Sequence, residues 1–163
     1  MQLYHGSIEI IEQPKILEKQ RLLDFGKGFY LTSSREQAER WALIKMKRSG
    51  GKAKAVVNCY RITDGFISNS QLKTKIFNAA TEEWLDFVLH NRSNDSPHEY
   101  DVVIGPVAND TLYQTLSLFE TGILTKPETV ARLKAHRLFD QYSFHTPEAL
   151  ACVNFVEAYL VEH

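Results

Sequence analysis

The chain has 163 residues with a formal net charge of -1, and 44% of them are apolar, which is typical of one globular domain spanning 1–163. The near-neutral charge gives no general attraction to nucleic acid, and no apolar run is long enough to cross a bilayer. Because the N-terminus lacks a signal-peptide pattern and the two cysteines form no metal or disulfide pattern, we expect a cytoplasmic protein with no bound metal and no membrane contact.

Short stretches with the composition of β-strands recur along the chain. They lie at 2–6, 28–32, 55–62, 100–107, 140–145 and 153–161. Helical patterns begin after Ser33–Ser34, Thr81, Thr125 and Thr146, where an acidic residue or a proline follows within the first turn. Because strands and helices are mixed without regular alternation, the sequence predicts an α+β fold with a largely antiparallel sheet.

Two segments near the N-terminus carry side chains suited to ligand binding. In Tyr4-His5-Gly6-Ser7, an imidazole and an uncovered glycine backbone can contact the same ligand. In 24–32, two glycines bracket a lysine before a strand whose Tyr30 can stack on a flat aromatic ligand. Taken alone, each segment is more typical of structure: a strand that ends in a turn, and a hairpin with aromatic core residues.

The strand expected late in the chain has one polar face. Gln141, Ser143 and His145 share this face, which forms either the wall of a site or a solvated edge. Arg92, at the end of a helix, either binds a pyrophosphate through two parallel hydrogen bonds or fixes the neighbouring loop. The basic stretch 45–54 is more typical of a solvated helix end than of a nucleic-acid contact.

The order and spacing of these segments resemble the ADP-ribosyltransferase superfamily. A His-Gly-Ser strand, a Gly-Lys-Gly-Phe-Tyr segment and a late polar strand follow one another here at 5–7, 26–30 and 141–144. Nearly the whole chain also resembles a bacterial family described only as a domain of unknown function, through those segments and 83–87, 91–92 and 100–108. Members of that family often sit in small operons that resemble toxin–antitoxin pairs.

The resemblance implies an ADP-ribosyltransferase-like split antiparallel sheet with flanking helices, and NAD bound as substrate between its halves. The implied catalytic residues are His5, Tyr30 and Gln141. The implied NAD-binding residues are His5, Gly6, Ser7, Gly28, Tyr30, Thr32, Ser33, Trp41 and Arg92. In this scheme His5 contacts the adenosine ribose, Gly6 grips the nicotinamide carboxamide, and Tyr30 stacks on the nicotinamide ring. Trp41 is either a second stacking residue or a core residue of its helix.

Gln141 stands where active members of the superfamily have glutamate. Glutamine keeps a hydrogen bond to a ribose hydroxyl, but it cannot stabilise a cation by charge or act as a general base. Three interpretations follow. Gln141 only orients the substrate, or another carboxylate (Asp140, Asp24 or Glu148) substitutes, or the protein binds NAD and does little chemistry.

The resemblance therefore implies an NAD-dependent ADP-ribosyltransferase that modifies a macromolecular acceptor, either protein or nucleic acid. It further implies the toxin of a bacterial toxin–antitoxin pair, with a small antitoxin protein as partner. The alternative is a catalytically silent module that binds NAD or ADP-ribose. The related RNA 2'-phosphotransferase chemistry needs basic side chains that converge on a phosphate, and only His5 and Arg92 are available for that role.

Overall fold

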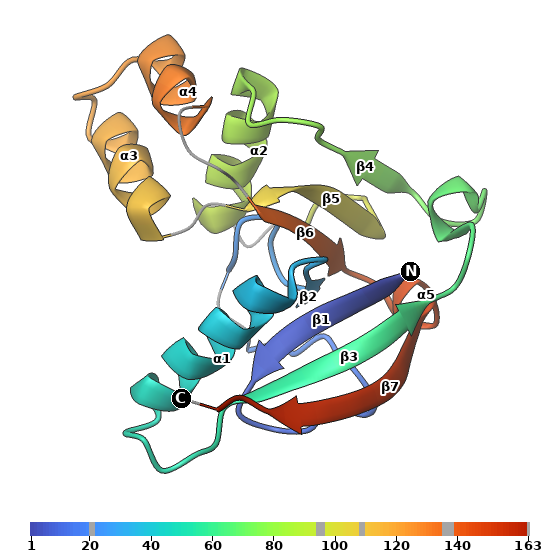
Figure 1. Cartoon of the computed structure of the whole chain (residues 1–163). Helices are drawn as coiled ribbons and strands as arrows, with labels where there is room; N and C mark the ends of the chain where they lie inside the picture. Colours follow the sequence, from blue (N-terminus) through green and yellow to red (C-terminus); the bar gives the residue numbers. More distant parts are fainter. Residues whose placement is uncertain (20–21, 94–96, 108–109, 135–138, 163) are drawn as a thin grey trace.

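The computed structural model describes residues 1–19, 22–93, 97–107, 110–134 and 139–162 (Figure 1). Its strands are β1 Gln2–Ser7, β2 Phe29–Leu31, β3 Val56–Ile62, β4 Thr74–Ile76, β5 Val102–Val107, β6 Phe139–Phe144 and β7 Val153–Leu160. Its helices are α1 Arg35–Arg48, α2 Glu82–Ser93, α3 Asp110–Glu120, α4 Lys126–Lys134 and α5 Pro147–Leu150, with a 3-10 helix at Phe66–Ser68. The mixture of helices and sheets confirms the α+β class.

The strands form two sheets. The first sheet has the order β1-β3-β7 and the second has the order β2-β6-β5-β4. Neighbouring strands are antiparallel except for β4 and β5, which are parallel. In the described part of the chain one bridge links the two sheets: Tyr4 and Thr32 exchange two main-chain hydrogen bonds of 2.9 Å. The prediction of largely antiparallel pairing is confirmed, whereas β4 was not predicted.

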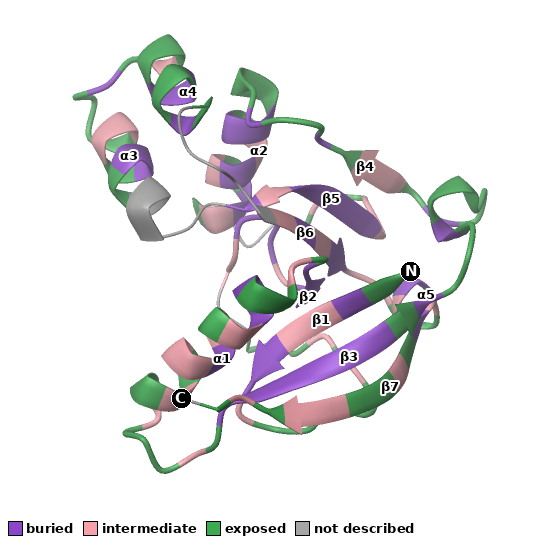
Figure 2. Cartoon of the chain, in the orientation of Figure 1, coloured by how far each residue is buried: buried purple, intermediate pink, exposed green. Residues whose placement is uncertain are grey.

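The two sheets pack face to face and enclose the main core. Leu3 and Tyr60 from the first sheet meet Phe29 and Phe144 from the second, and all four are buried. The outer face of the second sheet packs against α2, α3 and α4, which Figure 1 shows gathered beside β5 and β6. Figure 2 shows β3 buried along most of its length, whereas β7 at the sheet edge is partly exposed.

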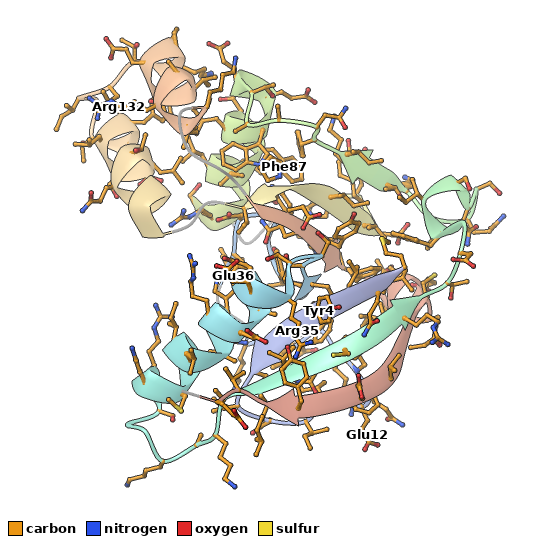
Figure 3. The ribbon with its side chains drawn as sticks, in the orientation of Figure 1. Tyr4, Glu12, Arg35, Glu36, Phe87 and Arg132 are labelled. Atoms are coloured by element: carbon orange, nitrogen blue, oxygen red, sulfur yellow. The ribbon has the colours of Figure 1, made fainter. Side chains whose placement is uncertain are left out.

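Helix α1 covers the outer face of the first sheet and positions much of the candidate site. It begins at the predicted cap, because the Ser34 side chain accepts a hydrogen bond from Gln37 N. Arg35 ties the helix to the sheet: its guanidinium lies 4.4 Å from the centre of the Tyr159 ring and donates to the Tyr159 hydroxyl at 2.8 Å. Figure 3 shows Arg35 over the first sheet, on the face that also carries Tyr4.

No helix among the described residues is both long enough and apolar enough to span a bilayer.

Candidate functional site

His5 spans the point where β1 and β2 stop pairing. Its Nδ1 lies 2.7 Å from the Tyr30 carbonyl oxygen, and its ring stacks on Phe29 with centroids 4.6 Å apart. Burial, and after it the nearby Lys45 ammonium, lower the pKa of His5 to about 3. The ring is therefore neutral at physiological pH. Since Nδ1–H donates to a carbonyl, Nε2 is left as a hydrogen-bond acceptor.

Gly6 turns its main chain toward β2. Main-chain groups in an antiparallel strand alternate between the two sides, and Tyr4 bonds to Thr32, so Gly6 directs its N–H and C=O to that same side. A Cβ on Gly6 would lie 2.1 Å from the Ala38 carbonyl oxygen of α1, so a larger residue requires the helix to move. The Gly6 carbonyl accepts a 2.7 Å hydrogen bond from Lys45 Nζ. We call His5, Gly6, Tyr30 and Thr32 the β1–β2 junction.

Among the described residues, two buried side-chain amides near the junction each have one atom without a hydrogen-bond partner. Gln141 on β6 is 2% exposed, and no group in the described chain bonds to its Nε2. It lies next to Thr32, since the preceding pair of the β2–β6 register joins Leu31 to Tyr142. Gln37 on α1 is also 2% exposed and its Oε1 is likewise unpaired. Buried polar atoms nearly always have a partner, so both amide ends are candidates for ligand contacts.

Asp140 fixes the turn that leads from β2 into α1. Its carboxylate accepts hydrogen bonds from Ser33 N at 3.1 Å and from Ser33 Oγ at 2.7 and 2.8 Å, and Thr32 Oγ1 lies 3.4 Å away. Asp140 is adjacent to Gln141 but is occupied by these contacts. Glu148, another carboxylate suggested as a substitute, is exposed on α5. Ser33 therefore has a visible structural role in this turn.

Tyr30 anchors the glycine loop (Gly26–Gly28) that precedes β2. Its hydroxyl donates to the Gly26 carbonyl at 2.5 Å and accepts from Phe25 N at 3.1 Å. Its ring packs edge-on against His145 with centroids 6.1 Å apart, and the residue is only 6% exposed. The anchoring role is visible in the structure, whereas stacking on nicotinamide stays a prediction.

The same loop is held from the other side by histidines. His145 Nδ1 lies 2.6 Å from the Lys27 carbonyl, and its Nε2 lies 2.7 Å from Ser143 Oγ. Burial, and then the neighbouring His98, lower the pKa of His145 to about 4. A Cβ on Gly28 would lie 2.7 Å from the His145 ring, which explains the glycine there. A cavity of about 290 Å³ borders the loop and both histidines, and none of the three predicted catalytic residues is among its described lining residues.

The other predicted NAD-binding residues are Arg92, Trp41 and Ser7. Arg92 lies 3.8 Å from the carboxylate of Asp24, which is only 3% exposed, so the structure favours its role in fixing the loop. Trp41 is half-buried on α1, one turn before Lys45. Ser7 is buried, and its hydroxyl accepts a hydrogen bond from the main chain two residues later.

Sequence reasoning missed two residues of α1 as members of the site. Gln37 and Lys45 lie four residues before and after Trp41, so all three share one side of the helix. That spacing was the available signal. Lys45 is an exposed residue in the last turn of α1, as expected, and its ammonium also contacts Gly6 and His5, which was not expected.

Within the described residues, no group of three or more histidine, cysteine, aspartate or glutamate side chains is placed to hold a metal ion.

A family model described as "Protein of unknown function (DUF3990)" matches residues 1–155. Neither the curated proteins nor the solved structures gave a match. The matched residues include every member of the candidate site, from His5 to Gln141. The chain therefore belongs to the DUF3990 family, whose description assigns no function.

Proposed function

We propose that this protein is an NAD-dependent ADP-ribosyltransferase that acts on a macromolecular acceptor. One observation carries the proposal: the main chain of Gly6 and the neutral imidazole of His5 are presented together where β1 and β2 stop pairing. A carboxamide offers one acceptor and two donors, which match the N–H and C=O of Gly6. A ribose hydroxyl can donate to His5 Nε2. The order of the motifs, which resembles that superfamily, supports the same assignment.

The reaction would break the bond between nicotinamide and ribose. The electron pair of that bond leaves with nicotinamide, which departs as a neutral molecule. The acceptor nucleophile forms the new bond to the ribose carbon and releases its proton to solvent or to a base. Because the transition state resembles an oxocarbenium ion, preorganised polar groups lower the barrier. Gln141 would hold a ribose hydroxyl through its Nε2, which has no partner among the described residues, without supplying charge.

A second candidate is a module that binds NAD or ADP-ribose without catalysis. A specific observation favours it: Gln141 carries no charge, and the adjacent Asp140 carboxylate is engaged by Ser33. On the resemblance to families found in toxin–antitoxin operons, we further propose that the protein acts in the bacterial cytoplasm as a toxin and that a small antitoxin protein is its partner.

The test is transfer of label from NAD. The purified protein is incubated with a bacterial lysate and NAD labelled in its adenylate half, and incorporation is followed before and after protease or nuclease treatment. We expect incorporation by the wild type and loss of it in His5→Ala. The matched control is His90→Ala, which replaces an exposed histidine of α2 and should keep the activity.

Two other outcomes would contradict the proposal in different ways. Measurable NAD binding without incorporation or nicotinamide release would favour the silent module. Absence of NAD binding by the folded wild type would contradict both candidates. If incorporation occurs, its sensitivity to protease or to nuclease identifies the class of acceptor.

A further inference from the structure

Lys45 occupies the acceptors that the proposed function assigns to NAD. Its Nζ donates to the Gly6 carbonyl at 2.7 Å and lies 3.5 Å from His5 Nε2. These are the carbonyl expected to bind a carboxamide and the imidazole nitrogen expected to bind a ribose hydroxyl. A ligand that uses either group must therefore displace the Lys45 ammonium.

No carboxylate of the described residues forms an ion pair with Lys45. Lys73, Lys75 and Lys126, by contrast, each form an ion pair with a glutamate or an aspartate. Its two contacts are with a neutral carbonyl and a neutral imidazole. Burial of its ammonium end lowers the pKa of Lys45 to about 8, which leaves the group mainly protonated at pH 7.

The position of Lys45 on α1 allows it to move without unfolding the helix. Although its ammonium end is buried, Lys45 is an exposed residue. Its four-carbon chain can therefore rotate while the helix stays packed through Ala38 and Ala42. Trp41 and Gln37 precede it on the same side of α1, one and two turns away. An anion bound along this side of the helix would meet the released ammonium.

We infer that Lys45 binds the phosphate groups of the nicotinamide nucleotide: the ligand takes over Gly6 and His5, and the displaced ammonium pairs with its phosphates. This inference rests on the proposed function and adds a specificity residue to it. Lys45 disfavours nicotinamide compounds without phosphate, because they must displace a hydrogen-bonded cation and offer it no new partner. Phosphorylated compounds regain that interaction as a charge-assisted one.

The test compares three ligands that differ in phosphate content: nicotinamide riboside, nicotinamide mononucleotide and NAD. Binding to the full chain is measured by titration calorimetry for the wild type, Lys45→Met, Lys45→Arg and the matched control Lys47→Met. Lys47 lies on the same turn of α1 and is exposed. In Lys45→Met we expect binding of NAD to weaken about tenfold while binding of the riboside stays equal or becomes tighter. Lys45→Arg should keep the preference for phosphate, and Lys47→Met should behave as the wild type.

An NAD-to-riboside affinity ratio that is the same in Lys45→Met and the wild type would overturn the inference and leave the proposed function intact. If that unchanged ratio comes from equal weakening of all three ligands, the result assigns Lys45 a structural role. A folded wild type that binds none of the three ligands would overturn the proposed function and this inference together. As a further expected result, added salt should weaken NAD binding more in the wild type than in Lys45→Met.

Discussion

The two sides of β2 satisfy their polar groups in different ways. On the side of the glycine loop, the carbonyls of residues 25–27 each accept a hydrogen bond from a buried or half-buried side chain, namely His98, Tyr30 and His145. On the side of the β1–β2 junction, an exposed lysine holds the acceptors, and the nearby Gln141 has an unpaired Nε2.

This difference separates a structural region from one suited to a ligand. Three side chains hold the glycine loop, and removing any of them takes a hydrogen bond from a buried or partly buried carbonyl, which costs about 1–3 kcal/mol where the carbonyl is fully buried. Among the described residues, Lys45 alone pairs the Gly6 carbonyl and His5 Nε2 at the junction, and nothing pairs the nearby Gln141 Nε2. A ligand that forms hydrogen bonds with those groups gains binding free energy from interactions that the folded chain does not make by itself. Substitutions that remove only a side-chain hydrogen bond should therefore mainly lower stability at the glycine loop and mainly weaken binding near the junction.

The largest effect is expected from Gly6→Ala. The added methyl would lie 2.1 Å from the main-chain oxygen of Ala38, so α1 must move away from β1. We expect a loss of roughly 3 kcal/mol in the free energy of unfolding, measured by urea denaturation, together with loss of NAD binding. The comparison variant is Gly105→Ala, where the new methyl would lie 3.0 Å from Phe77 Cβ and 3.2 Å from Phe25 Cζ, so shifts of a few tenths of an ångström relieve both contacts and we expect a smaller loss. Equal losses in both variants would contradict a special fit between Gly6 and α1.

Tyr30→Phe tests the glycine loop. The variant keeps the ring but leaves the Gly26 carbonyl and the Phe25 N–H without their partner, so we expect a loss of about 2 kcal/mol in the free energy of unfolding. Calorimetry on the folded variant should show NAD binding close to that of the wild type, since a stacking ring is retained. A variant that is stable but no longer binds NAD would assign the hydroxyl to the ligand site.

The pH dependence of stability tests the histidine that holds the same loop. The pKa of His145 is lowered from 6.5 to about 4 in the folded chain, so between these values the unfolded state binds more protons. Stability should therefore fall as the pH drops from about 6.5 toward 4, with a contribution of at most roughly 1.4 kcal/mol per pH unit from this one proton. Below about pH 4 His145 is protonated in both states, and its own contribution to the loss stops growing.

The measurement is the urea midpoint across that pH range in the wild type, His145→Asn and His90→Asn. His145→Asn should have a lower stability at neutral pH and a shallower dependence on pH. His90→Asn should keep the slope of the wild type. An unchanged slope in His145→Asn would assign the acid sensitivity to other groups.

The smallest effect on stability is expected from Gln141→Met. Methionine has a similar volume and no unpaired donor, so we expect the free energy of unfolding to stay the same or rise by up to about 1 kcal/mol. NAD binding should weaken about tenfold, because the amide that would hold a ribose hydroxyl is gone. A clear loss of stability with unchanged binding would place Gln141 with the structural region instead.

Local signals made part of this fold predictable. Ser34 precedes α1 and caps it, and the cap at Thr125 is confirmed by its exchange of hydrogen bonds with Glu128. Such interactions lie within one helical turn, so the sequence contains them directly. Strand β4 was missed because Thr74–Ile76 is only three residues long and places Lys75 at its centre. Its strand character depends on its partner β5.

The candidate site was harder to predict, because its contacts join distant segments. The sequence predicted that Gly6 lets a ligand approach its main chain. The structure shows that the missing side chain also allows helix α1 to pack directly against β1. Lys45 has the sequence context of a solvated helix end, and only the approach of α1 to β1 places its ammonium on two acceptors. Asp140 was considered as a replacement carboxylate, but no sequence pattern shows that Ser33 would engage it.

The pairing of the strands also sets when the site can exist during synthesis. His5 and Tyr30 leave the ribosome early, but β2 is hydrogen-bonded to β6 at Phe139–Phe144, more than a hundred residues later. Strand β3, which is hydrogen-bonded to β1 on one side, is likewise paired on its other side with β7 at Val153–Leu160. Contacts of such long sequence separation form only after both partners have been made. A nascent chain that lacks β6 and β7 therefore contains His5 and Tyr30, but the two residues are not yet held together. Any activity begins only once β6 and β7 have been translated.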